Sequence, residues 1–522
     1  MRTRCRNLFR LVLLVILAAA AWCVFDHRDG PIERYVSVER SIKIWPDYSG
    51  TVIPPNIAPL NFLIKESGGR YCVKIYSKDG RVIEVFSKTG SIIIPAGRWH
   101  QLLNMNRGRE LYFDIFVKTQ NSRWSRFPTI TNKIASEDID NFLVYRKIYP
   151  GHSKWGQMGI YQRNLETCDE SAILENRFFE NGCVNCHSFR RNLPDKMLID
   201  IRSTKYGVSA LLIESETITK IGRKLGFTTW HPSGRLIVCS INKPRLFFHS
   251  SRSYVQDILE VDSGLIYYML DSRTMETSPS ICKKDRLETF PEWSPDGRWL
   301  YFSSAPKWWK DENEIKHDKI MYDLVRVSYD VNTGQWGPVE TVLSAAETGL
   351  SIIQPRVSPD GRWLLACMCT YGTWVTHNMT SDLYMIDIEA AKRTGRYEYR
   401  RLDINSDRSE SWHSWSSNSR WIVFSSKMDY DIFTKPYFSY IDNEGRVYKP
   451  LLLPQKDPRF YDFCLDSFLV PEFITAPVSK TSEKLARIVR GRETLTVEMP
   501  VTMATPVTGK SFGTKDKELW RE

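Results

Sequence analysis

The chain has 522 residues, of which 42% are hydrophobic, 25% charged and 12% aromatic, and its formal net charge is +11. This length exceeds what one core usually organises, so two or more domains are expected. The composition excludes a disordered chain, and its aromatic content, with 17 Trp, favours a mainly β fold. No run of Lys and Arg interleaved with aromatic residues follows the N-terminus, so nucleic-acid binding is not supported.

Residues 1–25 form a predicted signal peptide or membrane anchor. Arginines at positions 2, 4, 6 and 10 precede an apolar run from Leu11 to Phe25. A basic start followed by such a run is typical of an export signal, whether it is cleaved or retained. The positive-inside rule leaves the arginines in the cytoplasm. We therefore expect a periplasmic protein, anchored to or exported across the cytoplasmic membrane.

Residues 30–145 are predicted to form a β-sandwich-like domain. The stretch "YCVKIYSKDGRVIEVFSKTGSIIIPAG", which begins at Tyr71, consists of short alternating runs separated by turns at Lys78-Asp79-Gly80 and Lys88-Thr89-Gly90. Alternation with a period of two indicates strands, and the turn residues between them indicate hairpins.

A short helical segment, residues 146–204, is expected next. From Ala135 to about Asn176 apolar residues recur at three- and four-residue spacing, and Ser136 and Glu137 suit a helix start. These predicted helices lead directly into the pentapeptide Cys183-Val-Asn-Cys186-His187.

Residues 205–465 contain an internal repeat. Its four copies are "TTWHPSGRLIVCS" from Thr228, "FPEWSPDGRWLYFSS" from Phe290, "QPRVSPDGRWLLAC" from Gln354 and "HSWSSNSRWIVFSS" from His413. Each copy places turn residues before a strand, although the fourth has Ser-Asn-Ser where Pro-Asp-Gly is expected. Repeated units that bury one face against the next predict a β-propeller, and the remaining strands favour about six blades.

These four copies resemble the TolB-like, WD-like propeller repeats of exported bacterial proteins. The resemblance covers about half of the chain. Beyond the propeller, residues 466–522 are predicted to form a C-terminal tail with one short helix after Val478 and a polar end.

The pentapeptide predicts one covalent c-type haem. Two cysteines separated by two residues can form thioethers with the two vinyl groups of a haem, and the following histidine can ligate the iron. Cys183 and Cys186 are therefore the predicted attachment residues, and His187 is the predicted axial ligand. Two alternatives stay open. A zinc site would need a second ligand pair, and a redox-active dithiol would need a βαβ context, neither of which is visible.

Met197, close downstream, is the predicted ligand on the opposite face of the iron, with Met158 and His152 as alternatives. For each Met, a core-filling thioether is the competing interpretation. His231 and His413 flank the repeat turns, where a hydrogen-bonded role at a strand end competes with one in the propeller channel.

The order of these segments, with "CVNCHSF" and "HSWSSNSRWIVFSS", resembles predicted exported haem-c propeller proteins of Bacteroides-type bacteria. The resemblance implies this architecture more than an activity. Our leading hypothesis is a membrane-tethered periplasmic monohaem protein, similar to a c-type cytochrome, that transfers single electrons and docks a partner on its propeller. One alternative is a TolB-like binding or scaffold protein with a structural or redox-sensing haem. Another is a haem peroxidase or reductase. The sequence identifies neither the redox partner nor a propeller ligand.

Overall fold

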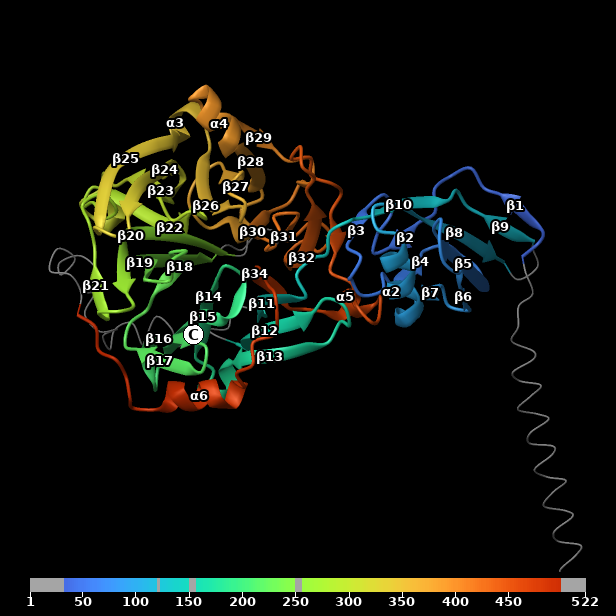
Figure 1. Ribbon diagram of the computed structural model, residues 1–522, viewed down its shortest axis with the longest axis horizontal. Coiled ribbons are helices and arrows are strands. Elements are labelled where there is room, and N and C mark those ends of the chain that lie inside the picture. Colours follow the sequence, from blue (N-terminus) through green and yellow to red (C-terminus); the bar gives the residue numbers. More distant parts are fainter. Residues whose placement is uncertain (1–31, 120–122, 150–155, 249–255, 499–522) are drawn as a thin grey trace, which may run out of the picture.

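The computed structural model describes residues 32–119, 123–149, 156–248 and 256–498, which form a smaller N-terminal unit beside a ring of sheets (Figure 1). The expected export segment, His152 and the polar end of the tail lie outside the described residues. No helix within these ranges combines the length and apolar character needed to cross a membrane.

The N-terminal unit is built from two sheets and one helix. The larger sheet has the order β1 (Tyr35–Ser37), β9 (Trp124–Arg126), β8 (Glu110–Lys118), β10 (Ile130–Ile134) and β3 (Val52–Ile53), with β5 (Arg70–Tyr76) paired to β8 and to β6 (Ile83–Ser87). The smaller sheet contains β2 (Ile44–Trp45), β4 (Phe62–Ile64) and β7 (Ser91–Ile92). Helix α2 (Ala96–Met105) buries Trp99, whose indole N–H donates to the Ile57 carbonyl at 3.0 Å.

Six antiparallel sheets of four strands follow, numbered here sheet 1 to sheet 6. Sheet 1 is β13 (Glu170–Glu175), β12 (Met158–Asn164), β11 (Phe142–Ile148) and β34 (Ser467–Ile474). Sheet 2 is β14 (Cys183–Arg190), β15 (Leu193–Ser203), β16 (Gly207–Glu214) and β17 (Thr217–Ile221). Sheet 3 is β18 (Gly226–Trp230), β19 (Leu236–Phe248), β20 (Gln256–Met269) and β21 (Thr274–Glu276).

The remaining sheets continue this order. Sheet 4 is β22 (Arg286–Trp293), β23 (Trp299–Pro306), β24 (Asp323–Asp330) and β25 (Gln335–Leu343). Sheet 5 is β26 (Ser351–Val357), β27 (Trp363–Cys369), β28 (Asp382–Asp387) and β29 (Tyr399–Arg401). Sheet 6 is β30 (Glu410–Trp415), β31 (Trp421–Ser426), β32 (Lys435–Tyr440) and β33 (Leu451–Leu452).

Short helices connect or cover these sheets. The α-helices are α3 (Ala345–Thr348), α4 (Ile388–Thr394), α5 (Phe460–Phe463) and α6 (Ser482–Arg490). The 3₁₀ helices are η1 (Asn176–Phe179), η2 (Glu312–Glu314), η3 (His317–Lys319) and η4 (Val375–His377). Helix α6 lies where the sequence predicts one short helix in the tail.

The sheets succeed one another in a cycle. The strands β14, β18, β22, β26, β30 and β34 each contact the next one, and β34 returns to contact β14 (Figure 1). We call these six the inner strands. A cycle of four-stranded sheets is consistent with a β-propeller, and the predicted mainly β fold is confirmed.

The helices predicted between Ala135 and Asn176, and the helical character of segment 146–204, are wrong. In the part of this stretch that the structure describes, the chain forms strands β11 to β15, and the short helix η1 lies between β13 and β14. Leu143, Val144 and Tyr145 are all fully buried because β11 lies between β12 and β34 with both faces covered. A short apolar run of this kind has no periodicity that separates strand from helix. The four-stranded sheets therefore extend from Phe142 to Ile474, beyond the predicted 205–465.

The repeated turns explain why the four sequence copies adopt one structure. In sheet 5, the Ser358 hydroxyl donates to Asp360 at 2.5 Å and accepts from the Trp363 backbone N–H at 2.9 Å. In sheet 6, Asn418 accepts the corresponding bond from Ser416 at 2.7 Å. Ser419, with φ +60°, adopts the left-handed conformation that a glycine has in the other copies. The divergent fourth copy thus forms the same turn.

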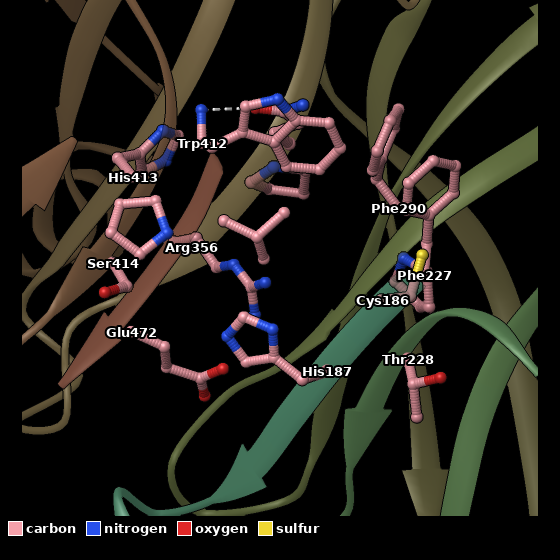
Figure 2. A pocket seen from close by; sticks show the side chains of 15 residues that line it. Cys186, His187, Phe227, Thr228, Phe290, Arg356, Trp412, His413, Ser414 and Glu472 are labelled. Carbon is pink, nitrogen blue, oxygen red and sulfur yellow. Dashed lines mark hydrogen bonds between the residues drawn. The ribbon is translucent and has the colours of Figure 1, made fainter. Parts of the chain in front are cut away.

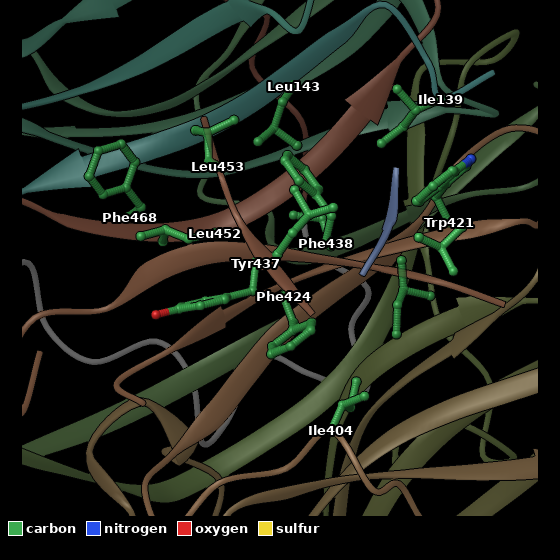
Figure 3. Packing of buried hydrophobic residues seen from close by; sticks show 14 of the residues in the cluster. Ile139, Leu143, Ile404, Trp421, Phe424, Tyr437, Phe438, Leu452, Leu453 and Phe468 are labelled. Atoms are coloured by element: carbon green, nitrogen blue, oxygen red, sulfur yellow. The ribbon is translucent and has the colours of Figure 1, made fainter. Parts of the chain in front are cut away.

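A continuous core joins the closing strand to sheet 6 (Figure 3). Phe468 of β34 and Leu143 of β11 pack in the same cluster as Trp421, Phe424 and Phe438, and all five are essentially inaccessible to solvent. Burial of each such side chain stabilises the fold by about 1.5–3 kcal/mol. The ring is therefore closed by the pairing of β34 with β11 and also by an apolar core shared between sheets 1 and 6.

We expect that replacing Gln162 by alanine loosens the C-terminal segment from sheet 1. The buried Gln162 amide donates to the Val478 carbonyl at 3.1 Å and accepts from the Val478 N–H at 2.7 Å. Loss of both bonds should lower the free energy of unfolding by about 1–3 kcal/mol, measured by guanidinium denaturation. Exposed Gln335 provides the control substitution to alanine. Equal stability of both variants would contradict this role.

Candidate functional site

Each inner strand carries one irregular residue at the same place. These residues have left-handed backbone conformations, with φ of +40° at Cys186, +31° at Phe227, +50° at Phe290, +53° at Gln354, +50° at Trp412 and +52° at Val470. The pairing register shifts beside each of them, which is the signature of a β-bulge. All six line one pocket, which we call the axial pocket. The bulges therefore turn one residue of every sheet toward a shared centre.

One side of the axial pocket is aromatic. Phe227 lies 4.2 Å from Phe290 and 5.9 Å from Trp412 between ring centroids (Figure 2). The Trp412 indole is held by a 2.7 Å bond to the Thr376 hydroxyl. Because sheets 3 and 6 lie opposite each other in the cycle, contact between their rings fills the axis. The enclosed space is accordingly small, about 40 Å³.

The other side of the pocket is charged. The Arg356 guanidinium donates to Glu292 at 3.1 Å, and Figure 2 shows it directed toward His187 beside Glu472. Glu472 also accepts the backbone N–H of Phe189 at 3.1 Å. Burial raises the pKa of both carboxyls, that of Glu472 to about 7, although Arg356 opposes this shift. One guanidinium thus stands between two carboxyls in a poorly hydrated space.

His187 is buried, and neither of its ring nitrogens makes a hydrogen bond among the described residues. Burial, with a smaller contribution from Arg146 and Arg356, lowers the pKa of His187 to about 3, and the Val470 backbone only partly opposes this. The ring is therefore neutral at pH 7, which is the form that binds metals. A buried neutral imidazole without a well-formed hydrogen bond is unusual, and its nitrogens could serve as ligands to a bound group.

The two motif cysteines are both free and differ in position. Cys186 lines the axial pocket beside His187, whereas Cys183, at the start of β14, does not. Cys183 lies 3.5 Å from the Arg202 guanidinium, and both thiols lie within the electrostatic reach of Arg202 and Arg146. Burial raises the pKa of Cys186, which keeps it as a thiol. The structure brings Cys186 and His187 together and leaves Cys183 beside the pocket.

Met197 is not among the residues that line the axial pocket. It is fully buried on β15 opposite Phe189, within the apolar cluster between sheets 1 and 2. Met158 is also a core residue, and its sulfur accepts the Val184 N–H at 3.3 Å. Both methionines have the packing role that competed with ligation.

The two repeat histidines differ. His413 lines the axial pocket, and its Nε2 has no hydrogen-bond partner within the described part of the chain. Burial lowers the pKa of His413 to about 3, so this ring too is neutral. His231 instead bonds Ser233 at 2.7 Å and the Gly297 carbonyl at 3.0 Å. Only His413 therefore faces the site.

The charged and aromatic residues of the pocket were missed by sequence reasoning. A signal for them exists in the repeats when "FTTW", "FPEW", "QPRV" and "WHSW" are aligned. Their first column contains the bulge residues, and their third column contains Glu292 and Arg356. The four repeat copies quoted from the sequence begin at different positions of the repeat, so their bulge residues do not line up unless the copies are realigned.

The donor groups at the motif, two free thiols and an imidazole, are those that a c-type haem uses, but the extended strand places Cys183 outside the pocket that holds Cys186 and His187. The enclosed volume of the axial pocket, about 40 Å³, is too small for a porphyrin, because sites that bind small molecules usually enclose about 300–1,000 Å³. In the described ranges, no three or more His, Cys, Asp or Glu side chains are grouped so that they could hold a metal ion by themselves. A haem at this site would therefore require the aromatic side chains to move.

No protein-family model and no curated protein matches the sequence. Among solved structures, the chain is similar to Kuenenia stuttgartiensis hydrazine synthase, with 14% identity, a TM-score of 0.30, and coverage of 50% of this chain and 64% of that one. It is also similar to a puromycin hydrolase, with 16% identity, a TM-score of 0.34, and coverage of 59% and 45%. A third similar structure is an oligogalacturonate lyase from Vibrio parahaemolyticus, with 11% identity, a TM-score of 0.30, and coverage of 59% of this chain and 93% of that one. Likenesses this distant say nothing about activity.

Proposed function

We propose that the protein is a membrane-tethered periplasmic electron carrier, a six-bladed TolB-like propeller with one c-type haem. Cys183 and Cys186 would hold the haem covalently, and His187 would ligate its iron. The observation that carries the proposal is the buried, neutral His187, whose two nitrogens are unbonded in the described structure, beside the free thiol of Cys186. Bound in this way, a haem supplies reversible one-electron chemistry.

The surrounding residues would bias that chemistry. The guanidinium groups of Arg146, which is buried, and Arg202, which is half-buried, lie near both thiols. Positive charge in a region of low dielectric constant favours the less positive, reduced state of a nearby redox centre. The aromatic side of the pocket, with Phe227 and Trp412, would exclude water and provide an apolar surface.

As a second residue that would hold the iron we propose His413 in place of Met197. His413 lines the same pocket as His187 and has an unbonded Nε2 in the described structure, whereas Met197 belongs to the neighbouring core. Two nitrogen ligands would close the iron to exogenous ligands, which supports an electron carrier over a peroxidase or reductase. The propeller surface would then serve to dock a redox partner.

The first test is covalent attachment. The full-length protein, expressed with a c-haem maturation system, should give a pyridine haemochrome spectrum with about one haem per chain that survives acid-acetone extraction. The double variant Cys183→Ser with Cys186→Ser should lose all extraction-resistant haem. Cys464→Ser, at a free cysteine outside the axial pocket, should retain it. Absence of haem from the unaltered chain would overturn the proposed function.

The second test distinguishes the axial ligands. In the reduced protein, carbon monoxide should bind weakly, and His413→Ala should increase its affinity at least about tenfold by opening one face of the iron. Met197→Leu, which conserves the volume of a core residue, should leave carbon monoxide binding unchanged. If Met197→Leu opened the iron and His413→Ala did not, ligation by His413 would be wrong.

A further inference from the structure

A second and larger cavity lies between the N-terminal unit and sheet 6, and it shares no residue with the axial pocket. Its volume is about 570 Å³, within the usual range for sites that bind small molecules. Its walls are the loop from Trp45 to Gly50, the connection between β32 and β33, and residues near Arg400 and Met428. Sites between domains are common places for ligands. We call this cavity the lateral cavity.

The two walls of the lateral cavity are fixed to each other. Lys449 donates to Asp47 at 2.7 Å and to the Ser49 carbonyl at 2.9 Å, across the boundary between the units. Asp47 in turn accepts the Ser49 hydroxyl at 2.5 Å. A second connection is made by Asn61, whose amide donates to the Lys456 carbonyl at 3.0 Å. The cavity is therefore a preformed space.

Some of the charged side chains that line the cavity have an ion-pair partner in the described structure, and others do not. Asp47 and Lys449 neutralise each other, and Asp429 accepts the Tyr437 hydroxyl at 2.5 Å while burial raises the pKa of its carboxyl. Arg400 and Arg446 make no ion pair with any residue that the structure describes, since Arg400 donates only to the Gly445 carbonyl. The cavity thus presents two guanidinium groups that have no carboxylate partner of their own among the described residues.

Aromatic faces stand beside these guanidinium groups. Trp45 is half-buried and rests on Tyr430 at 5.9 Å between centroids, which fixes the orientation of its ring. Tyr448 is also half-buried, and the Arg446 guanidinium lies 5.1 Å from its ring centroid. Asp403 is exposed and lines the same cavity, where its carboxylate can accept hydrogen bonds from hydroxyl groups.

We propose that the lateral cavity binds a sugar that carries a carboxylate, of the uronic acid class. A guanidinium fork pairs with a carboxylate through two parallel hydrogen bonds, which suits Arg400 and Arg446. An aromatic face such as that of Trp45 packs against the apolar face of a sugar ring. The hydroxyl groups of the sugar would then face Asp403. This inference is independent of the haem, because the two sites share no residue.

Calorimetric titration of the full-length protein with D-glucuronate tests this proposal. Glucuronate should bind, whereas its neutral methyl ester, glucose and inorganic phosphate should each bind at least about tenfold more weakly, because a charged hydrogen bond is lost or the ring contact is absent. Arg400→Gln and Arg446→Gln should each weaken glucuronate binding by a similar factor. Trp45→Leu should weaken glucuronate and glucose alike.

Arg298→Gln is the matched control, because Arg298 is an exposed arginine outside the cavity, and it should leave binding unchanged. All three arginines are surface side chains, so unaltered melting temperatures should show that the variants are folded. The proposal is overturned if glucuronate does not bind, if its ester binds equally well, or if phosphate binds more tightly. It is also overturned if the two cavity arginine variants behave like the control.

Discussion

The pairing of β34 with β11 is the interaction on which the rest of the structure depends. It joins residues more than 300 positions apart and completes sheet 1, so that each inner strand has a neighbour on both sides. Phe468 and Phe473 of β34 lie in the core that extends into sheet 6. Without this strand, the apolar edges of sheets 1 and 6 would face water, and the ring would have two open ends.

Six bulges at equivalent positions direct side chains of different chemistry into the axial pocket at the centre of the ring. A regular inner strand would alternate its side chains between the adjacent sheets, whereas the bulge directs an extra side chain toward the axis. Five residue types occupy these six positions, with phenylalanine at two of them, while the backbone conformation remains the same. The repeat therefore conserves a conformation and varies the functional groups that it presents, and the motif of Cys183, Cys186 and His187 is one of six variations on it.

The sequence was sufficient to predict the repeated units, because their turns and buried strands are local features. It also singled out Cys186 and His187 as candidates, and both residues line the axial pocket. It did not predict that the run around Val144 and the motif both lie on strands, because short buried stretches of this kind have no distinctive period. Nor could it place Glu472 or Trp412 in the same pocket as His187, since their common location follows from closure of the ring. The choice between Met197 and His413 depends on that same long-range geometry.

The strand that closes the ring also supplies Val470 and Glu472 to the axial pocket. The pocket is consequently assembled from residues between Cys186 and Glu472 and cannot be complete in a chain that lacks β34. During synthesis, Cys183 and Cys186 emerge long before that strand, at a stage when the axial pocket is still incomplete. Contacts of such long range form slowly. The order of the chain thus provides a period in which an enzyme could modify the thiols before folding encloses them.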